Sequence, residues 1–134
     1  MLGAGLAIAP LGGFLAVTGA WSSPWWILAA LAAGVMCWTG GFDILYALQD
    51  IEFDRALGLH SVPARVGAHR ALVVARALHI GTVLLLGAVG FAVSGGWLYG
   101  AGVAVAAGLL VFEHSLVNPD DVSNVDKAFF TVNS

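Results

Sequence analysis

Long apolar segments dominate this chain and constrain its fold more than any other feature. They cover residues 2–20, 25–48, 71–93 and 98–112, and a further apolar stretch begins at residue 127. A helix needs about 20 mostly apolar residues to cross the hydrocarbon core of a bilayer, and the period-2 alternation of strands is absent. The pattern predicts an all-α, polytopic transmembrane helical bundle with about four spans and the start of a fifth.

The composition excludes an ordinary soluble domain. Hydrophobic residues make up 60% of the 134 residues and charged residues only 10%, whereas about a quarter of a typical soluble domain is charged. We expect a single domain over residues 1–134, incomplete at both ends because its first and last segments stop in mid-pattern. The chain has no basic tail, so membrane lipid, and not nucleic acid, is the expected partner. The sequence leaves the oligomeric state open.

The connections between the segments alternate in polarity. WSSPWW (residues 21–26) and SGGWLY (residues 94–99) are uncharged and carry Trp and Tyr, which favour the membrane–water boundary. The connections at residues 49–70 and 113–127 hold nearly all the charge, and all four arginines lie between residues 55 and 76. By the positive-inside rule, we expect both polar connections on the cytoplasmic side.

Glycine occurs 18 times, often inside the apolar segments. In a bilayer, small residues let helix backbones approach closely. We therefore expect these glycines to mark contacts between helices rather than a cofactor site.

Three aspartates lie at helical spacing around the end of the second segment. Asp43, Asp50 and Asp54 are seven and four residues apart, so on one continuous helix they fall within about 40° of each other, with Tyr46 about 60° to one side. Asp50 and Asp54 would be about 6 Å apart along the axis, close enough for one Mg²⁺, whereas Asp43 would lie about 16 Å from Asp54. A carboxylate in a span is costly, so Asp43 should face the bundle or a wet cavity. The spacing equally allows a solvated helix end, with Asp43 paired to an arginine.

A shaped polar loop follows the aspartates. Gly58 suits a helix stop, and Pro63 marks a turn before the next span. Arg55, Arg65 and Arg70 add donors that suit phosphate oxygens. Together with the carboxylates they suit a Mg²⁺-bridged polyanion at a membrane surface. Alternatively, the arginines only set the topology and contact anionic lipid.

The stretch DILYALQDIEFDRALGLHSVP (residues 43–63) resembles the second aspartate-rich motif of the UbiA superfamily of membrane prenyltransferases, in its form D-x-x-Y-A-x-x-D-x-x-x-D-x-x-x-G-x-x-S-x-P. The flanks LAIAPLGGFLAVTG and FEHSLVNPDDVSNVDKAFFTVN also look like family segments. Within the superfamily, the chain looks most like 4-hydroxybenzoate polyprenyltransferases and similar enzymes of menaquinone synthesis. The resemblance implies a nine-helix fold, of which this chain would form helices five to eight and the start of nine.

The resemblance also implies a reaction: Mg²⁺-dependent transfer of a polyprenyl group from prenyl diphosphate to an aromatic acceptor such as 4-hydroxybenzoate, in ubiquinone or menaquinone synthesis. Asp50 and Asp54 match the acids that hold Mg²⁺. Asp43 and Tyr46 match residues that line the catalytic site. The protein would be a bacterial inner (plasma) membrane enzyme with its motif loop on the cytoplasmic side.

Two further residues match the family loop that approaches the diphosphate, Ser61 and Arg65. The family's other aspartate motif, N-D-x-x-D-x-x-x-D, does not occur in this sequence. We therefore expect the complete protein to be a prenyltransferase and this chain alone to be inactive.

Residues outside the motif receive structural interpretations. We expect Glu113 and His114 to form an interfacial helix end, and His79 to be a packing histidine with satisfied hydrogen bonds. Trp38 is expected to pack in the bundle, with a place in an acceptor pocket as the alternative. The aspartates at residues 120–121 are interpreted as solvated or helix-capping.

Two other functions are compatible with a charged patch on a membrane protein. One is a different Mg²⁺-dependent membrane enzyme of phosphate chemistry, such as a CDP-alcohol phosphotransferase, whose D-G-x-x-A-R signature this sequence lacks. The other is a non-catalytic membrane fragment or scaffold in which the acids only set the topology.

Overall fold

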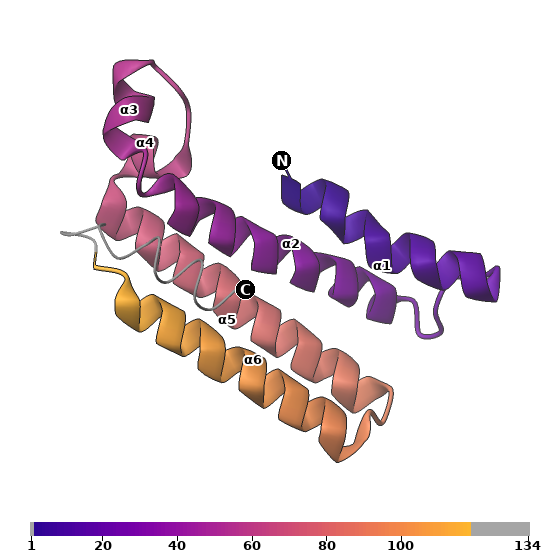
Figure 1. The fold of residues 1–134 in the computed structure, drawn as a ribbon. Helices are drawn as coiled ribbons and strands as arrows, with labels where there is room; N and C mark the ends of the chain where they lie inside the picture. Colours follow the sequence, from indigo (N-terminus) through magenta and orange to yellow (C-terminus); the bar gives the residue numbers. More distant parts are fainter. Residues whose placement is uncertain (1, 119–134) are drawn as a thin grey trace.

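The computed structural model describes residues 2–118 and folds them into helices. In chain order these are α1 (Leu2–Thr18), α2 (Trp26–Ala47), α3 (Ile51–Ala56), α4 (Val62–Val66), α5 (Ala68–Ala92) and α6 (Gly96–Leu116). The long helices α1, α2, α5 and α6 pack against one another in that order. The short α3 and α4 sit together at one end of the row (Figure 1).

The predicted transmembrane helical fold is confirmed. Helices α2, α5 and α6 are each long and apolar enough to cross a membrane, and α1 adds a shorter apolar helix over Gly3–Thr18. The predicted segments and the long helices differ only at their boundaries, since α5 begins at Ala68 and α6 continues to Leu116. The further helix start predicted at residue 127 lies outside the described residues, as do the aspartates at residues 120–121.

Small residues and side-chain donors join α2 to α5. Gly34 of α2 faces Leu85 of α5, and its carbonyl oxygen accepts a hydrogen bond of 3.2 Å from the hydroxyl of Thr82. One turn further along α2, the carbonyl oxygen of Trp38 lies 3.2 Å from Nε2 of His79. Because the two helices run in opposite directions, these two bonds connect successive turns of both. Gly34 and Gly41 of α2 thus mark helix contacts, as predicted. Other glycines of the apolar segments do not: a methyl group at Gly12, Gly13, Gly100, Gly102 or Gly108 would meet no atom within 4 Å among the described residues.

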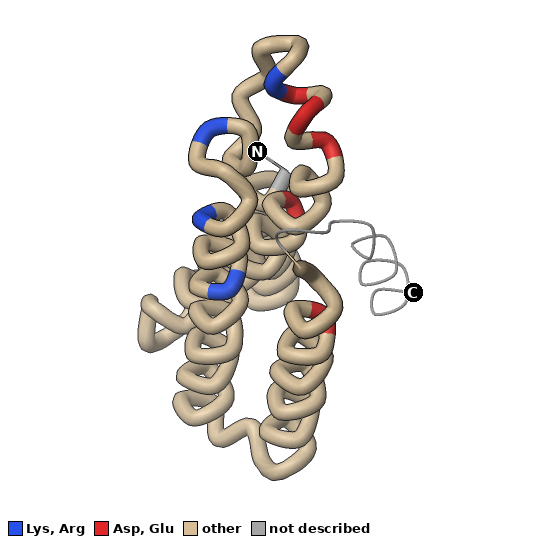
Figure 2. Tube along the Cα trace, turned by 90° about the vertical axis from the view of Figure 1, so that its left-hand side faces the viewer, with Lys and Arg blue, Asp and Glu red and all other residues tan. Residues whose placement is uncertain are grey.

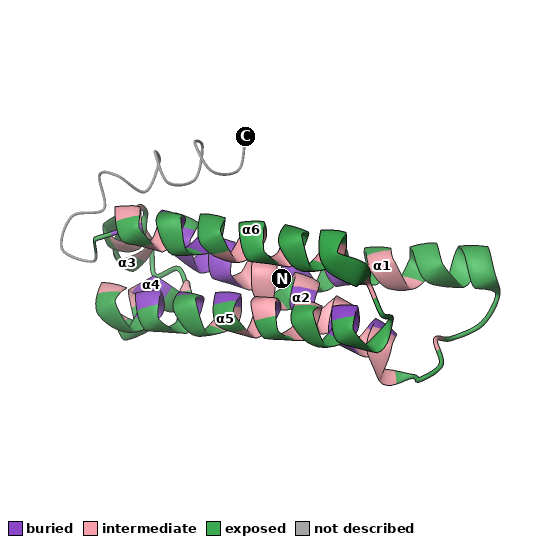
Figure 3. Cartoon of the chain, turned by 90° about the horizontal axis from the view of Figure 1, so that it is seen from below, coloured by how far each residue is buried: buried purple, intermediate pink, exposed green. Residues whose placement is uncertain are grey.

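The main apolar core lies beside these bonds, toward the end that carries α3 and α4. Its buried members come from α2, α5 and the residues that directly follow α2 and α6, and they are Ile44, Leu45, Leu48, Ala71, Leu72, Ala75 and Val117. Figure 3 shows buried positions on the facing sides of the long helices and exposed positions on their outer sides. The outer surface is rich in large apolar side chains, as expected for helices in lipid.

The two ends of the helix row differ in chemistry. Charged residues of both signs gather at the end that carries α3 and α4 (Figure 2). At the other end, the connection between α1 and α2 exposes Trp21 and Trp25, and α6 starts beside the exposed Trp97. The structure therefore matches the predicted alternation of polar and aromatic connections. That the charged end faces the cytoplasm stays a prediction.

Polar side chains join α6 to α5 at two places. Near the start of α6, the Tyr99 hydroxyl donates a hydrogen bond of 2.9 Å to the carbonyl of Leu86, and the Tyr99 ring covers Gly90. Near the other end of α6, His114 meets His79. These contacts set where α6 lies against α5.

The substitution Gly90→Ala tests the first of these contacts. A methyl group at Gly90 would overlap the Tyr99 ring, whereas one at Gly87, also on α5, would meet no atom within 4 Å. We expect G90A to lower the free energy of unfolding by about 1–3 kcal/mol. The matched G87A should raise it slightly, by up to about 1 kcal/mol, because Ala favours helix more than Gly. Thermal unfolding of the chain in detergent measures both, and equal stability of the two variants would contradict this packing.

Candidate functional site

The helix that carries Asp43 ends at Ala47. The N–H groups of Leu48 and Gln49 each bond at 3.2 Å to a carbonyl three residues earlier, which is the tighter pattern often seen at helix ends. The side chain of Leu48 is fully buried (0% exposed), so the apolar core fixes this point of the chain. Asp50 then leaves helical geometry, with φ −99° and ψ 12°, and begins α3. The condition for a face shared by all three aspartates, one continuous helix, is therefore not met.

Asp43 and Tyr46 lie on the exposed side of the last turns of α2. Both side chains are exposed, whereas Ile44 and Leu45 between them are buried in the core. The two residues are one turn apart on the same helix, so they share one face. Within this chain that face is at the surface, and Asp43 is not enclosed by the bundle as expected.

Asp50 and Asp54 form the first turn of α3. The N–H of Asp54 donates a hydrogen bond of 2.7 Å to the carbonyl of Asp50, so the two residues are successive on one helical face. Asp50 is exposed and Asp54 is partly buried. The four-residue step between these two acids lies after the end of α2, so it is unaffected by the break in the helix, and their pairing around one Mg²⁺ stays a prediction.

Two carboxylates could supply only part of a Mg²⁺ donor set. No group of three or more His, Cys, Asp or Glu side chains in residues 2–118 is arranged to hold a metal. Mg²⁺ commonly takes only one or two protein carboxylates and fills its remaining positions with water and substrate phosphates. Two carboxylates on one turn fit that mode of binding.

The loop after the aspartates is shaped by two helix-capping arrangements. At the end of α3, the N–H of Gly58 bonds to the carbonyl of Arg55 at 3.3 Å and the N–H of Leu59 to that of Asp54 at 2.7 Å. Gly58 has φ +67°, the left-handed conformation that this C-terminal motif requires. The predicted helix stop at Gly58 is confirmed.

Ser61 caps α4. Its hydroxyl oxygen accepts a hydrogen bond of 3.3 Å from the N–H of Ala64, and Pro63 occupies the first turn. Arg65 lies exposed in the last turn of α4. Ser61 therefore has a structural role, and its contact with diphosphate, like that of Arg65, stays a prediction.

Arg55 connects α3 to α4. Its Nε donates to the carbonyl of Ala64 at 3.3 Å, and its Nη1 lies 3.4 Å from Oε1 of Glu52. Both partners of this ion pair are exposed, so its contribution to stability is small. The Arg55 guanidinium, which we expected to contact phosphate, therefore links α3 to α4 in this chain.

The predicted site residues all lie at the charged end of the helix row, but they belong to three separate helices. They are Asp43 and Tyr46 on α2, Asp50 and Asp54 on α3, Ser61 at the start of α4 and Arg65 within it. Helix α4 packs against α2, α3 and α5, so the segment between α2 and α5 is held at the charged end of the helix row (Figure 1). This arrangement offers carboxylates, a phenol and a guanidinium at one membrane boundary.

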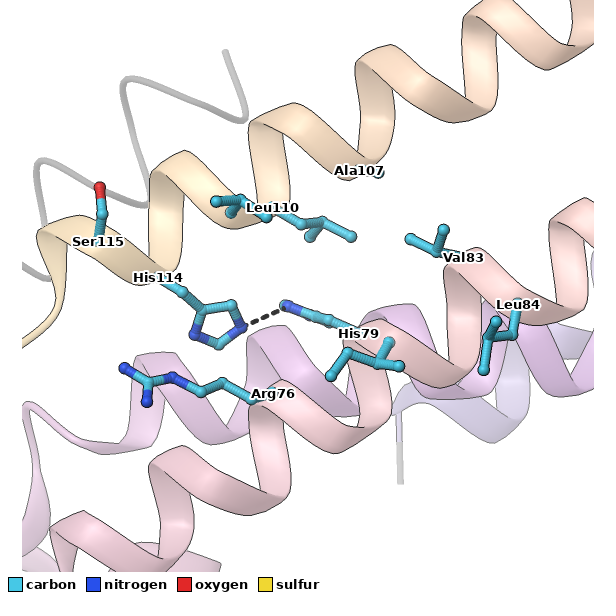
Figure 4. A pocket seen from close by; sticks show the side chains of 10 residues that line it. Arg76, His79, Val83, Leu84, Ala107, Leu110, His114 and Ser115 are labelled. Carbon is cyan, nitrogen blue, oxygen red and sulfur yellow. Dashed lines mark hydrogen bonds between the residues drawn. The ribbon is translucent and has the colours of Figure 1, made fainter.

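A second polar region lies between α5 and α6, and its composition was not expected. A half-open groove of about 490 Å³ has His79, His114, Arg76 and Ser115 among its polar lining residues and is otherwise mostly apolar. In Figure 4, His114 points from α6 toward His79 of α5, and Arg76 lies on the same side of the groove as the two rings. The rings are joined by a contact of 3.0 Å between Nδ1 of His79 and Nε2 of His114.

Glu113 and His114 lie in the last turn of α6, so they end this helix as expected, but the burial of Glu113 was not expected. Glu113 is 1% exposed, and His114 is partly buried against His79. The spacing of the residues could have predicted this burial. Leu110, Glu113 and Val117 are three and four residues apart, and all three are buried.

The expectations for His79 and Trp38 are confirmed. His79 is 2% exposed, and both of its ring nitrogens have partners. Trp38 packs beside Phe42, with ring centroids 5.4 Å apart, and beside His79 at 6.3 Å. It is a packing residue in the described part of the chain.

Comparison with known proteins identifies the family. Residues 1–134 match the UbiA prenyltransferase family. Relatives named 4-hydroxybenzoate octaprenyltransferase include one from Shewanella sediminis, 25% identical over 90% of this chain and 45% of the relative. Others are from Klebsiella pneumoniae, 32% identical over 72% of this chain and 33% of the relative, and from Methylococcus capsulatus, 31% identical over 75% and 34%. No solved structure matches.

This chain spans less than half the length of these relatives. The match nevertheless extends over all of its residues, and the helical membrane fold with acids at one end agrees with it. The chain belongs to the UbiA prenyltransferase family.

Proposed function

We propose that the complete protein transfers a polyprenyl group from prenyl diphosphate to an aromatic acceptor such as 4-hydroxybenzoate, in ubiquinone or menaquinone synthesis. The observation that carries this proposal is the family match over the whole chain, joined to an acid pair on one turn of α3. The relatives' names supply the acceptor class. The family match favours this reaction over that of a CDP-alcohol phosphotransferase.

Asp50 and Asp54 are the residues proposed to hold Mg²⁺. The bound ion would offset negative charge on the departing diphosphate. The two acids start a helix whose N-terminal turn is anchored next to buried Leu48, so their backbone position is fixed by the core. Such preorganised groups stabilise developing charge without reorganising during the reaction.

Arg65 and Ser61 are proposed to meet the diphosphate oxygens from the other side of the loop. A guanidinium presents several N–H donors in a plane, which suits phosphate. Ser61 accepts the Ala64 N–H through its oxygen, and its own hydroxyl hydrogen can still donate to an anion.

Asp43 and Tyr46 are proposed to line the reaction site on α2. In this reaction the bond between the prenyl carbon and the diphosphate oxygen breaks, the aromatic ring forms a bond to that carbon, and the ring loses a proton. A carboxylate and a phenol one turn apart can orient the acceptor ring through hydrogen bonds. The apolar helices around them would exclude water that could trap the prenyl cation.

The proposed activity belongs to the complete protein, at the cytoplasmic side of a bacterial plasma membrane. The alternative is a non-catalytic membrane fragment. An in-frame sequence upstream of residue 1 that encodes N-D-x-x-D-x-x-x-D would support the enzyme, and a gene without it would support the alternative.

The acid pair on α3 can be tested by mutation. In the complete protein, Asp50→Asn and Asp54→Asn should each lower prenyl transfer at least about 100-fold, because each removes one carboxylate from the Mg²⁺ donor set. Transfer of a radiolabelled prenyl group to 4-hydroxybenzoate in detergent, with Mg²⁺ titrated, measures this. EDTA should abolish the wild-type reaction.

Glu52→Gln is the matched control, because Glu52 is an exposed acid of the same helix that pairs with Arg55 at the surface. It should keep near-normal transfer. Near-normal turnover in both aspartate variants, or activity that survives EDTA, would refute the metal assignment.

Arg65 can be tested in the same way. Arg65→Gln should raise the KM for prenyl diphosphate about tenfold while leaving the KM for the aromatic acceptor unchanged, since a charge-assisted hydrogen bond to phosphate is worth about 1.5–3 kcal/mol. Arg65→Lys should show a smaller rise, because Lys keeps the charge but loses the planar set of donors. Equal changes in both KM values would show that Arg65 acts on the fold and not on the diphosphate.

A further inference from the structure

A buried histidine, His79, and a partly buried one, His114, connect three helices next to the candidate site. His79 of α5 is 2% exposed, and its Nε2 lies 3.2 Å from the carbonyl oxygen of Trp38 in α2. Its Nδ1 lies 3.0 Å from Nε2 of His114 in α6 (Figure 4). The two rings also stack edge to face, with centroids 5.0 Å apart. One continuous series of hydrogen bonds therefore crosses α2, α5 and α6.

The chemistry of the partners fixes the direction of these bonds. A carbonyl oxygen can only accept, so Nε2 of His79 carries a hydrogen and donates it to Trp38. In a neutral ring, Nδ1 of His79 then has a lone pair and accepts a hydrogen from Nε2 of His114. Nδ1 of His114 is left as an acceptor, and this buried atom has no partner among the described residues. Both histidines are thus assigned the same neutral tautomer, with hydrogen on Nε2.

His79 lies directly against the part of α2 that leads into Asp43. A methyl group at Gly41 would overlap the His79 ring, so glycine is needed there for the two helices to meet. The centroids of the Phe42 and His79 rings are 4.8 Å apart. Asp43 is the next residue along the chain. A shift of the His79 ring would therefore move the turn that carries Asp43 and, one turn on, Tyr46.

His114 extends this support to α6. Within α6 only Leu110 and Glu113 are buried, and the groove of about 490 Å³ separates part of it from α5. The hydrogen bond between His114 and His79 is a directional contact between α6 and α5 within the lining of this groove. In a bilayer, such polar contacts between helices fix their relative position where apolar packing alone does not.

We propose that His79 and His114 are a positioning pair that holds α5 and α6 against the Trp38 carbonyl and so sets the place of Asp43 and Tyr46 for prenyl transfer. This inference rests on the proposed function. The pair acts through α2 and does not touch the reacting atoms.

The test compares variants of the complete protein. His79→Leu and His114→Leu keep apolar bulk but remove the bonds, and should lower kcat about 10- to 100-fold, as expected when reacting groups are misplaced by about 1 Å. The KM for prenyl diphosphate should change less than twofold, because the histidine pair acts on α2, whereas the proposed ligands of the diphosphate-bound Mg²⁺, Asp50 and Asp54, lie on α3. His79→Gln can donate to Trp38 and accept from His114, so it should restore kcat to within about threefold of wild type. His69→Gln, an exposed position on the same helix, is the control.

If the two histidines had a purely structural role, the leucine variants would yield less folded protein, and kcat would not fall in the leucine variants and recover in His79→Gln. Thermal unfolding is therefore measured on every variant. Leucine variants with normal kcat, or a glutamine variant as slow as the leucine variant at equal stability, would overturn the proposal.

Ring ¹⁵N NMR of this 134-residue chain in detergent gives a test independent of activity. We expect hydrogen on Nε2 and a lone pair on Nδ1 in both His79 and His114, and loss of the His114 pattern in His79→Leu. Hydrogen on Nδ1 of His79 would overturn the proposed chain of bonds. A complete wild-type protein that shows this NMR pattern but transfers no prenyl group would refute the proposed function and leave the pair's geometry intact.

Discussion

The close approach of α2 and α5 is the constraint on which the other features depend. Inside a bilayer, polar groups must find partners within the protein, and apolar surface provides no drive for helices to associate. Here glycines at positions 34 and 41 let α5 come near enough for Thr82 and His79 to reach backbone carbonyls of α2. These bonds occur on successive turns, so they fix both the separation of the helices and their register. The apolar core next to them then determines where α2 can end.

That end of α2 controls the geometry of the acids. Leu48 is fully buried in the core, and the chain changes direction immediately after it. The aspartates therefore divide into two sets: Asp43 lies on α2, which has two hydrogen bonds to α5, whereas Asp50 and Asp54 lie at the start of α3. A site divided in this way can hold a metal-bound leaving group on the loop and an acceptor on the span, with the bond to be broken between them. A single continuous helix would have placed all three carboxylates along one line.

The sequence predicted the features that depend on local composition. Apolar length gave the long helices to within a few residues at each boundary, and Gly58 marked the end of α3, because both signals reside in a short stretch of chain. The apolar pattern placed the end of the second segment at Leu48, but it did not show whether the helix continues through the aspartates, because this depends on the burial of Leu48 in a core shared with α5, which is distant in sequence. The same reason applies to the histidine pair, whose members are 35 residues apart. Burial of Glu113 was accessible from its spacing to Leu110 and Val117, but the neighbouring polar residues favoured an interfacial end.

The exposed and unsatisfied groups of this chain indicate where the rest of the protein packs. Asp43 belongs to a helix long and apolar enough to span a membrane, yet it lies at the surface here, and a carboxylate that faces lipid within a span costs free energy. Oε2 of Glu113 is buried without a partner in residues 2–118, which also costs free energy unless a donor is supplied. Because the relatives are more than twice as long as this chain, helices from the remaining sequence can supply both the cover and the donors. In the proposed enzyme, the face of α2 that carries Asp43 and Tyr46 would then be an internal surface, where an acceptor ring would be shielded from lipid and water together.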